Sequence, residues 1–232
     1  MGIKSLIRKL VYPEKSISDH GFDASSKIEF PDLIKRTSRV DNSVLIGPIT
    51  VGEHCWLNGA SLSGNISIGN HTSINGPNTD IYSLGNDKVL VGNFTSIARS
   101  VSIQNYNHNY DRLTHYFIRQ NMFGESILND IVSKGDLTIG SDVWIGTQTV
   151  VLPGITIGDG VVIGAHSTIT KDIPAFSIVA GSPARIVKQR FSPEIIEILM
   201  ELQWWNWDDD KIHMHKDIFC DEISLQALKK LI

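Results

Sequence analysis

The stretch GDLTIGSDVWIGTQTVVLPGITIGDGVVIGAHSTITKDI, residues 135–173, decides the fold because its aliphatic residues return at a fixed interval. An α-helix requires an apolar period near 3.6 residues and a half-buried strand requires a period of 2, so a period of six fits neither element alone. It fits one face of a solenoid, in which each face is a short strand followed by a tight turn. The six repeat positions are Ile139, Ile145, Val151, Ile157, Ile163 and Ile169.

The same interval continues upstream, through Leu62, Ile68 and Ile74 and again through Val91, Ile97 and Ile103. Small or β-branched residues that suit short strands recur between the repeat positions, and glycines such as Gly158 supply the turns. We predict a parallel β-helix over residues 41–182, with about five or six triangular coils of roughly 18 residues each. A β-sandwich is the alternative, but its strands usually recur every 8 to 12 residues.

Two segments, residues 75–88 and 104–136, interrupt the repeat. Loops of this length in a compact domain are usually functional or disordered. The longer one carries His108 and His115 and is too aromatic for disorder. We therefore expect a protruding functional loop.

The two ends of the chain differ from the repeat. Residues 1–40 are expected to form an N-terminal extension with a short amphipathic helix, which is too short to span a bilayer. Residues 183–232 are expected to form a C-terminal helical cap over the open end of the solenoid. Ser192, Pro193 and Glu194 make a good helix start within that cap.

The composition and net charge of the chain limit the classes of partner to be expected. The chain has 232 residues and a formal net charge of −4, so it has no overall basic field for nucleic acid. Small molecules or other copies of the chain are the expected partners. Its two cysteines, Cys55 and Cys220, lack the spacing of a zinc or redox motif and suit a reducing compartment, so we expect a cytoplasmic protein.

Two runs of sequence resemble a known family. Residues 134–191, KGDLTIG to VKQRF, followed by WWNW, resemble the xenobiotic acetyltransferase branch of the hexapeptide-repeat acyltransferases, which includes chloramphenicol, streptogramin and sugar acetyltransferases. Residues 86–111, NDKVLVGNFTSIARSVSIQNYNHNYD, resemble the segment that leads into the family's catalytic loop, where an asparagine-histidine pair, here Asn107 and His108, carries the base. The resemblance implies an all-β, left-handed parallel β-helix with C-terminal α-helices. It also implies acetyl-CoA as the acyl donor and a homotrimer with active sites between subunits.

His108 is the predicted catalytic residue. The acceptor must lose a proton as it attacks a thioester, and imidazole suits this task because its ordinary pKa lies near neutral pH. The expected acceptor contacts are Asn107, Tyr110, Asp111 and Arg112. Asp111 could orient the imidazole or simply be solvated, and His115 is interpreted as a bystander.

Coenzyme A needs a groove for its pantetheine arm and cations for its phosphates. Small residues let the arm approach the coil backbone, and basic residues near the end of the repeat are candidates for the phosphates. The residues predicted for the arm are Gly146, Thr147, Gly164 and Ala165, and those for the phosphates are Lys171, Arg185, Lys188 and Arg190.

The acceptor is predicted to be a sugar, because the loop is rich in hydrogen-bonding side chains such as Asn105, Asn107, Asn109 and Arg112. A nucleotide-linked amino sugar of surface polysaccharide biosynthesis fits, although amine and hydroxyl acceptors stay open. The alternative acceptor is an antibiotic such as chloramphenicol or a streptogramin. A zinc carbonic anhydrase on the same fold would need a third convergent histidine, and a non-enzymatic β-helix would need a flat ladder of one residue type, so no metal is predicted.

Overall fold

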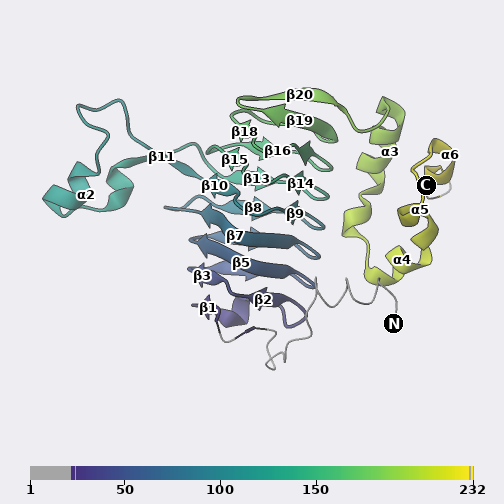
Figure 1. The fold of residues 1–232 in the computed structure, drawn as a ribbon, viewed down its shortest axis with the longest axis horizontal. Coiled ribbons are helices and arrows are strands. Elements are labelled where there is room, and N and C mark those ends of the chain that lie inside the picture. Colours follow the sequence, from purple (N-terminus) through teal and green to yellow (C-terminus); the bar gives the residue numbers. More distant parts are fainter. Residues whose placement is uncertain (1–21, 24, 230, 232) are drawn as a thin grey trace.

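The computed structural model describes residues 22–23, 25–229 and 231, and the chain winds as a β-solenoid of about eight turns (Figure 1). Its strands stack in parallel on three faces, which confirms the prediction of a hexapeptide β-helix. The first face holds β4 (Ile49–Val51), β6 (Ile66–Ile68), β8 (Val89–Val91), β13 (Leu137–Ile139) and β16 (Thr156–Ile157).

The other two faces are joined because two strands, β5 (Trp56–Ser63) and β7 (Ser73–Tyr82), are long enough to run through both. One of these faces continues with β2 (Arg39–Asp41), β9 (Ser96–Ile97), β14 (Trp144–Ile145), β17 (Val162–Ile163) and β19 (Ser177–Gly181). The other continues with β1 (Lys27–Ile28), β3 (Val44–Ile46), β10 (Ser102–Gln104), β15 (Val150–Val151) and β18 (Thr168–Ile169). The final strand β20 (Ala184–Gln189) turns back antiparallel to β19.

Aliphatic columns fill the interior of the solenoid. Each repeat position lies directly over its counterpart in the next coil, as Ile97 lies between Ile74 and Ile145. All three side chains are fully buried. This stacking explains the six-residue period, because the same inward position recurs on each face of every regular coil.

The solenoid begins earlier than residue 41. Phe22 already forms a parallel bridge with Val40, Ile28 pairs with Leu45, and Ile34 bridges Val51. These positions continue the six-residue count toward the N-terminus, and a five-residue step between Val40 and Leu45 hides it. Within residues 22–40 the helical element is the single turn η1 (Pro31–Leu33), and the helix expected near residues 1–12 lies outside the described residues.

The first predicted excursion is also shorter than expected. Strand β7 extends to Tyr82, so most of residues 75–88 belongs to the coils. What leaves the coil is a short turn after Ser83, whose side chain hydroxyl donates to the Asp87 carbonyl at 2.6 Å. Asn105 holds this turn, since its side chain accepts from the Leu84 amide at 2.9 Å.

The C-terminal helices lie along the side of the solenoid and not over its end, in contrast to the predicted cap (Figure 1). Their order is α3 (Pro193–Leu202), η3 (Trp204–Asn206), α4 (Asp209–Met214), α5 (Lys216–Cys220) and α6 (Leu225–Leu228). A second hydrophobic cluster, built on Phe176, Leu199, Trp205 and Leu228, joins them to the coils. Strand β20 takes the end position.

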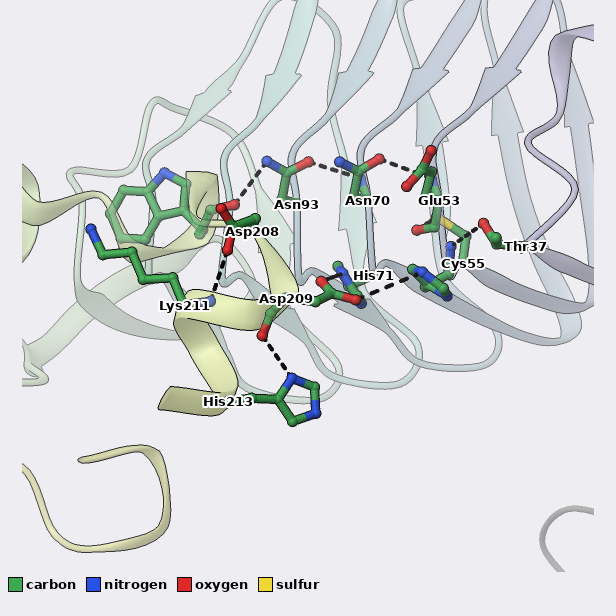
Figure 2. A network of polar contacts seen from close by, with 12 residues as sticks. Thr37, Glu53, Cys55, Asn70, His71, Asn93, Asp208, Asp209, Lys211 and His213 are labelled. Carbon is green, nitrogen blue, oxygen red and sulfur yellow. Dashed lines mark hydrogen bonds and ion pairs between the residues drawn. The ribbon is translucent and has the colours of Figure 1, made fainter. Parts of the chain in front are cut away.

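A polar ladder fixes η3 to one corner of the coils (Figure 2). Asn70 accepts from the Glu53 amide and Asn93 accepts from the Asn70 amide, both at 2.8 Å. The side-chain Nδ2 of Asn93 then donates to the Trp205 carbonyl at 3.0 Å. Beside this ladder, His71 Nε2 lies 2.8 Å from the Asp209 carboxylate, so the helical segment is bonded to early coils.

Candidate active site

The loop that carries His108 leaves the solenoid as an antiparallel hairpin. Strand β11 (Tyr106–His108) pairs with β12 (Ile131–Ser133), and His108 lies opposite Ile131. Beyond the hairpin the chain forms α2 (Ile118–Phe123) and the turn η2 (Ile127–Asn129), which project away from the coils (Figure 1). The predicted protruding loop is therefore present and has its own secondary structure.

The imidazole of His108 is held in one orientation. Its Nδ1 lies 2.8 Å from the main-chain oxygen of His115, and its ring lies 4.2 Å from the ring of Phe117, centroid to centroid. A carbonyl oxygen only accepts hydrogen bonds, so Nδ1 must carry the proton. In the neutral ring this leaves Nε2 with a free lone pair, which is the state that a general base requires.

Asp111 was weighed as the residue that orients His108 and His115 was predicted to be a bystander, but the structure places the contact at His115. Asp111 turns back on its own loop, where its amide donates to the Asn109 side chain at 3.1 Å. His115 acts through its main chain, while its ring meets that of His108 edge-on with centroids 6.2 Å apart. A backbone carbonyl leaves no side-chain signature, so the sequence held no signal for this contact.

The predicted acceptor residues have different surroundings. Arg112 donates to the Asn129 carbonyl at 2.8 Å, so its guanidinium holds the loop together. Tyr110 is exposed, and Asn107 lies in β11 opposite Val132. Asn105 is fully buried and braces the neighbouring turn, so it cannot contact an acceptor. Two of the polar side chains that favoured a sugar acceptor, Asn105 and Arg112, are thus occupied by hydrogen bonds within the chain.

The small residues predicted for the pantetheine arm come together at one corner of two successive coils. Gly146 donates its amide to the Ile163 carbonyl at 2.8 Å, and a Cβ at Gly146 would lie 2.6 Å from the Ala165 nitrogen. Thr147 accepts from the His166 amide at 2.9 Å through its main-chain oxygen. Only glycine fits at position 146, because a side chain there would collide with the backbone of the next coil.

This corner and His108 lie at opposite ends of one face. The corner precedes β15, whereas the loop departs after the end of β10, and β10 and β15 are parallel neighbours. The corner and the loop therefore belong to different ends of this face. The four cations predicted to bind the coenzyme phosphates differ in whether a partner already occupies them. Arg190 is tied to the Asp142 carboxylate at 2.9 Å and to the Gly160 carbonyl at 2.7 Å, whereas Lys171, Arg185 and Lys188 are all solvent-accessible.

A groove of about 640 Å³ lies elsewhere, between the coil corner and the C-terminal segment. Glu53, His71, Asp209 and Trp207 contribute to its lining, and His108 does not. Because the polar ladder and the His71–Asp209 contact bind the helices here, we interpret the groove as the seam of that packing and not as the catalytic site (Figure 2).

Within the residues that the structure describes, no group of three or more His, Cys, Asp or Glu side chains is arranged to hold a metal ion. None of the helices described is long and apolar enough to cross a membrane.

Comparison with known proteins agrees with the hexapeptide coils. Residues 136–171 match the family model described as bacterial transferase hexapeptide (six repeats). A probable macrolide acetyltransferase from Lysinibacillus sphaericus is 39% identical over 155 residues, which cover 63% of this chain and 85% of that protein. This chain belongs to the hexapeptide-repeat acetyltransferases. It falls in their xenobiotic acetyltransferase branch, as the resemblance predicted.

Two more relatives of this acetyltransferase bear on its substrate. A chloramphenicol acetyltransferase from Morganella morganii is 41% identical over 140 residues, covering 58% of this chain and 67% of the relative. Galactoside O-acetyltransferase from Escherichia coli strain K12 is 36% identical over 140 residues, covering 60% of this chain and 63% of the relative. The enzyme class predicted from the sequence, an acetyltransferase, is confirmed.

Proposed function

We propose that this acetyltransferase moves the acetyl group of acetyl-CoA to a hydroxyl group of an antibiotic of the amphenicol or macrolide kind, with His108 as general base. The observation that carries the mechanism is the His108 imidazole, whose Nδ1 is occupied by the His115 carbonyl and whose Nε2 is free to accept a proton. In the reaction Nε2 takes the hydroxyl proton while the acceptor oxygen attacks the thioester carbon. The new C–O bond forms, the C–S bond breaks, and the proton passes to the departing thiolate.

The coenzyme is proposed to lie along the corner formed by Gly146, Thr147, Gly164 and Ala165. The absence of bulky side chains at these four positions supports the proposal, because an extended chain could then approach the coil backbone closely. A coil amide there would stabilise the negative charge that develops on the thioester oxygen. Lys171, Arg185 and Lys188 are available for the phosphates, and Arg190 is not, because it already pairs with Asp142.

The active site is proposed to form between subunits of a homotrimer. The loop and the coenzyme corner are at opposite ends of a face within one chain, which supports a site that one copy completes with the loop of its neighbour. The loop also exposes apolar side chains that a neighbour would cover, including Leu113, which is fully exposed, and Tyr116, Met122 and Phe123. Exposed apolar patches of this kind mark interaction sites.

The relatives favour an antibiotic hydroxyl over the amino sugar that the loop composition suggested. Both the chloramphenicol and the macrolide acetyltransferase are about two-fifths identical to this chain. The loop agrees, because Arg112 and Asn105 are used internally while Tyr110 is free to contact an apolar or aromatic acceptor. A sugar hydroxyl is the second candidate, favoured by the similarity to galactoside O-acetyltransferase.

A substrate panel tests the acceptor. Purified enzyme with acetyl-CoA is offered chloramphenicol, a macrolide, a streptogramin, simple galactosides and nucleotide-linked amino sugars, and thiol release is measured. We expect turnover with the antibiotics. Activity confined to galactosides would establish the second candidate, and activity confined to amino sugars would return the acceptor to the one first predicted from the sequence.

The base is tested by His108→Ala and His108→Asn. Turnover should fall at least about a hundredfold, the usual contribution of a positioned base, while the assembly and acetyl-CoA binding are unchanged. His213→Ala is the control, because His213 is exposed on α4 and bonds only to the neighbouring turn. Retained turnover in both His108 variants would remove this residue from the mechanism.

A further inference from the structure

Asp130 is the buried charged side chain of the loop. Between residues 104 and 136, two polar side chains of the described chain are buried, Asn105 and Asp130, and Asp130 is only 3% exposed. A carboxylate is strongly destabilising when it is buried without partners for its oxygens. The partners of the Asp130 carboxylate therefore show which parts of the loop this side chain holds in place.

One oxygen of Asp130 fixes the start of α2. Oδ2 accepts the Gln120 amide at 2.9 Å. The residue at the N-cap of this helix, Phe117, provides no side-chain cap, so Asp130 satisfies from ten residues away a donor that a local Ser or Asp would usually satisfy. The position of Phe117 and of the preceding residues thus depends on Asp130.

The main chain of Asp130 and its second carboxylate oxygen hold residues near the start of the segment 109–120, which leads from β11 into α2. Its main-chain oxygen accepts the Asn109 amide at 3.1 Å, directly after β11. Its Oδ1 lies 3.5 Å from Arg112 Nη1, which also donates to the adjacent Asn129 carbonyl at 2.8 Å. Asp130 therefore binds the segment 109–120 near both of its ends.

The two groups that orient His108 lie inside this segment. The His115 carbonyl accepts from His108 Nδ1, and the Phe117 ring packs on the imidazole. We propose that Asp130 is a positioning residue that holds His108 in the tautomer with a free Nε2. This proposal rests on the proposed role of His108 as base, and it assigns Asp130 no contact with substrate.

The first test reads the tautomer directly and needs no acceptor. The ring nitrogens of His108 are observed by ¹⁵N NMR at a pH where the ring is neutral, in the intact protein. We expect the Nδ1–H form in the wild type and a mixture of both forms in Asp130→Ala. Glu125→Gln is the matched control, since it removes an exposed ion pair with Arg119 in the same loop and should leave the tautomer unchanged.

The second test separates kcat from KM. Asp130→Ala should lower kcat between about tenfold and about a hundredfold, as expected for a misplaced catalytic group, while the KM for acetyl-CoA stays within about twofold. If that variant does not fold, Asp130→Asn decides instead. It keeps an oxygen for the Gln120 amide but loses the charge facing Arg112, so it should show a smaller fall in kcat with KM preserved.

The outcomes distinguish the two proposals. An unchanged tautomer and an unchanged kcat in a folded Asp130 variant overturn the positioning role, whatever His108 does. If His108→Ala stays active while Asp130→Ala still alters the tautomer, the base assignment fails and the positioning role survives. Inactivity of His108→Ala, together with a shifted tautomer and reduced kcat in Asp130→Ala, supports both.

Discussion

The coils and the loop of this acetyltransferase are stabilised in opposite ways. Every face of the coils buries aliphatic side chains, so that Ile103 and Leu137, which flank the loop, are both fully buried. Between these two residues the loop buries no large hydrophobic side chain in the structure described; its buried groups are the polar Asn105 and Asp130. The coils depend on hydrophobic stacking, and the loop depends on individual polar contacts.

Stability and function are therefore carried by different regions of the molecule. A coil residue supports its neighbours above and below, so its removal damages the fold. A loop residue supports the orientation of one imidazole, so its removal damages turnover while the coils persist. Three substitutions test this contrast, beginning with the largest expected effect on stability.

Ile97→Ala should destabilise the protein most. The side chain is fully buried between Ile74 and Ile145, and its loss leaves a cavity that usually costs about 2–5 kcal/mol. The free energy of unfolding is measured by denaturant titration. Ser96→Ala is the matched control, because Ser96 is the exposed neighbour in β9, and it should change stability by less than about 0.5 kcal/mol. Equal effects at the two positions would contradict the stacked core.

Arg190→Ala should have an intermediate effect that depends on pH. Burial raises the pKa of Asp142 above its ordinary 3.8, and Arg190 opposes the rise. A raised carboxyl pKa means that the folded chain holds a proton which the unfolded chain has released. Between 3.8 and the raised pKa, stability therefore falls as the pH rises and is regained as the pH falls.

Without Arg190 the carboxylate loses its partner, which should cost about 1–3 kcal/mol near neutral pH and less as the pH falls. Denaturant titrations from about pH 4 to about pH 7 measure this dependence. Asp142→Asn is the control, because it removes the titrating group and should flatten the pH profile. A loss in Arg190→Ala that is the same at every pH would contradict the pairing.

Leu113→Ser should have the smallest effect on the chain itself. Leu113 is fully exposed at the loop, so the free energy of unfolding of one subunit should change by less than about 0.5 kcal/mol. If a neighbouring copy covers it, subunit association should weaken by about 1 kcal/mol per copy. Sedimentation across a concentration series measures this change, with Met214→Ser as the control, because Met214 is another strongly exposed apolar residue, on α4. Unaltered association in Leu113→Ser would place the interface elsewhere.

The regular part of the fold was predictable because a repeated aliphatic position is visible as a period. The period is broken where a coil changes length, as between Val40 and Leu45, so the sequence alone predicts an extension where the structure has coils. The path of the C-terminal helices was not predictable either. The ladder through Asn70 and Asn93 depends on which coil corner a helix reaches, and helical spacing does not encode that.

The candidate site was predictable only in part. His108 stands out because its residue type and its place in the interrupted repeat agree with its chemistry. The contact from the His115 carbonyl and the brace from Asp130 do not stand out, since one uses the backbone and the other joins residues that are far apart in sequence. Whether Lys171, Arg185 or Lys188 meets a phosphate stays a prediction.

The contact between His71 and Asp209 joins positions 138 residues apart. In an unbraced solenoid each coil touches only its neighbours, so terminal coils can fray independently and folding can spread from any point. Here α4, which follows the last coil in the sequence, is bonded to the early coils, so the early and late coils should unfold in a single cooperative transition. The early coils leave the ribosome first, yet they gain this brace only when synthesis of the helical segment is complete.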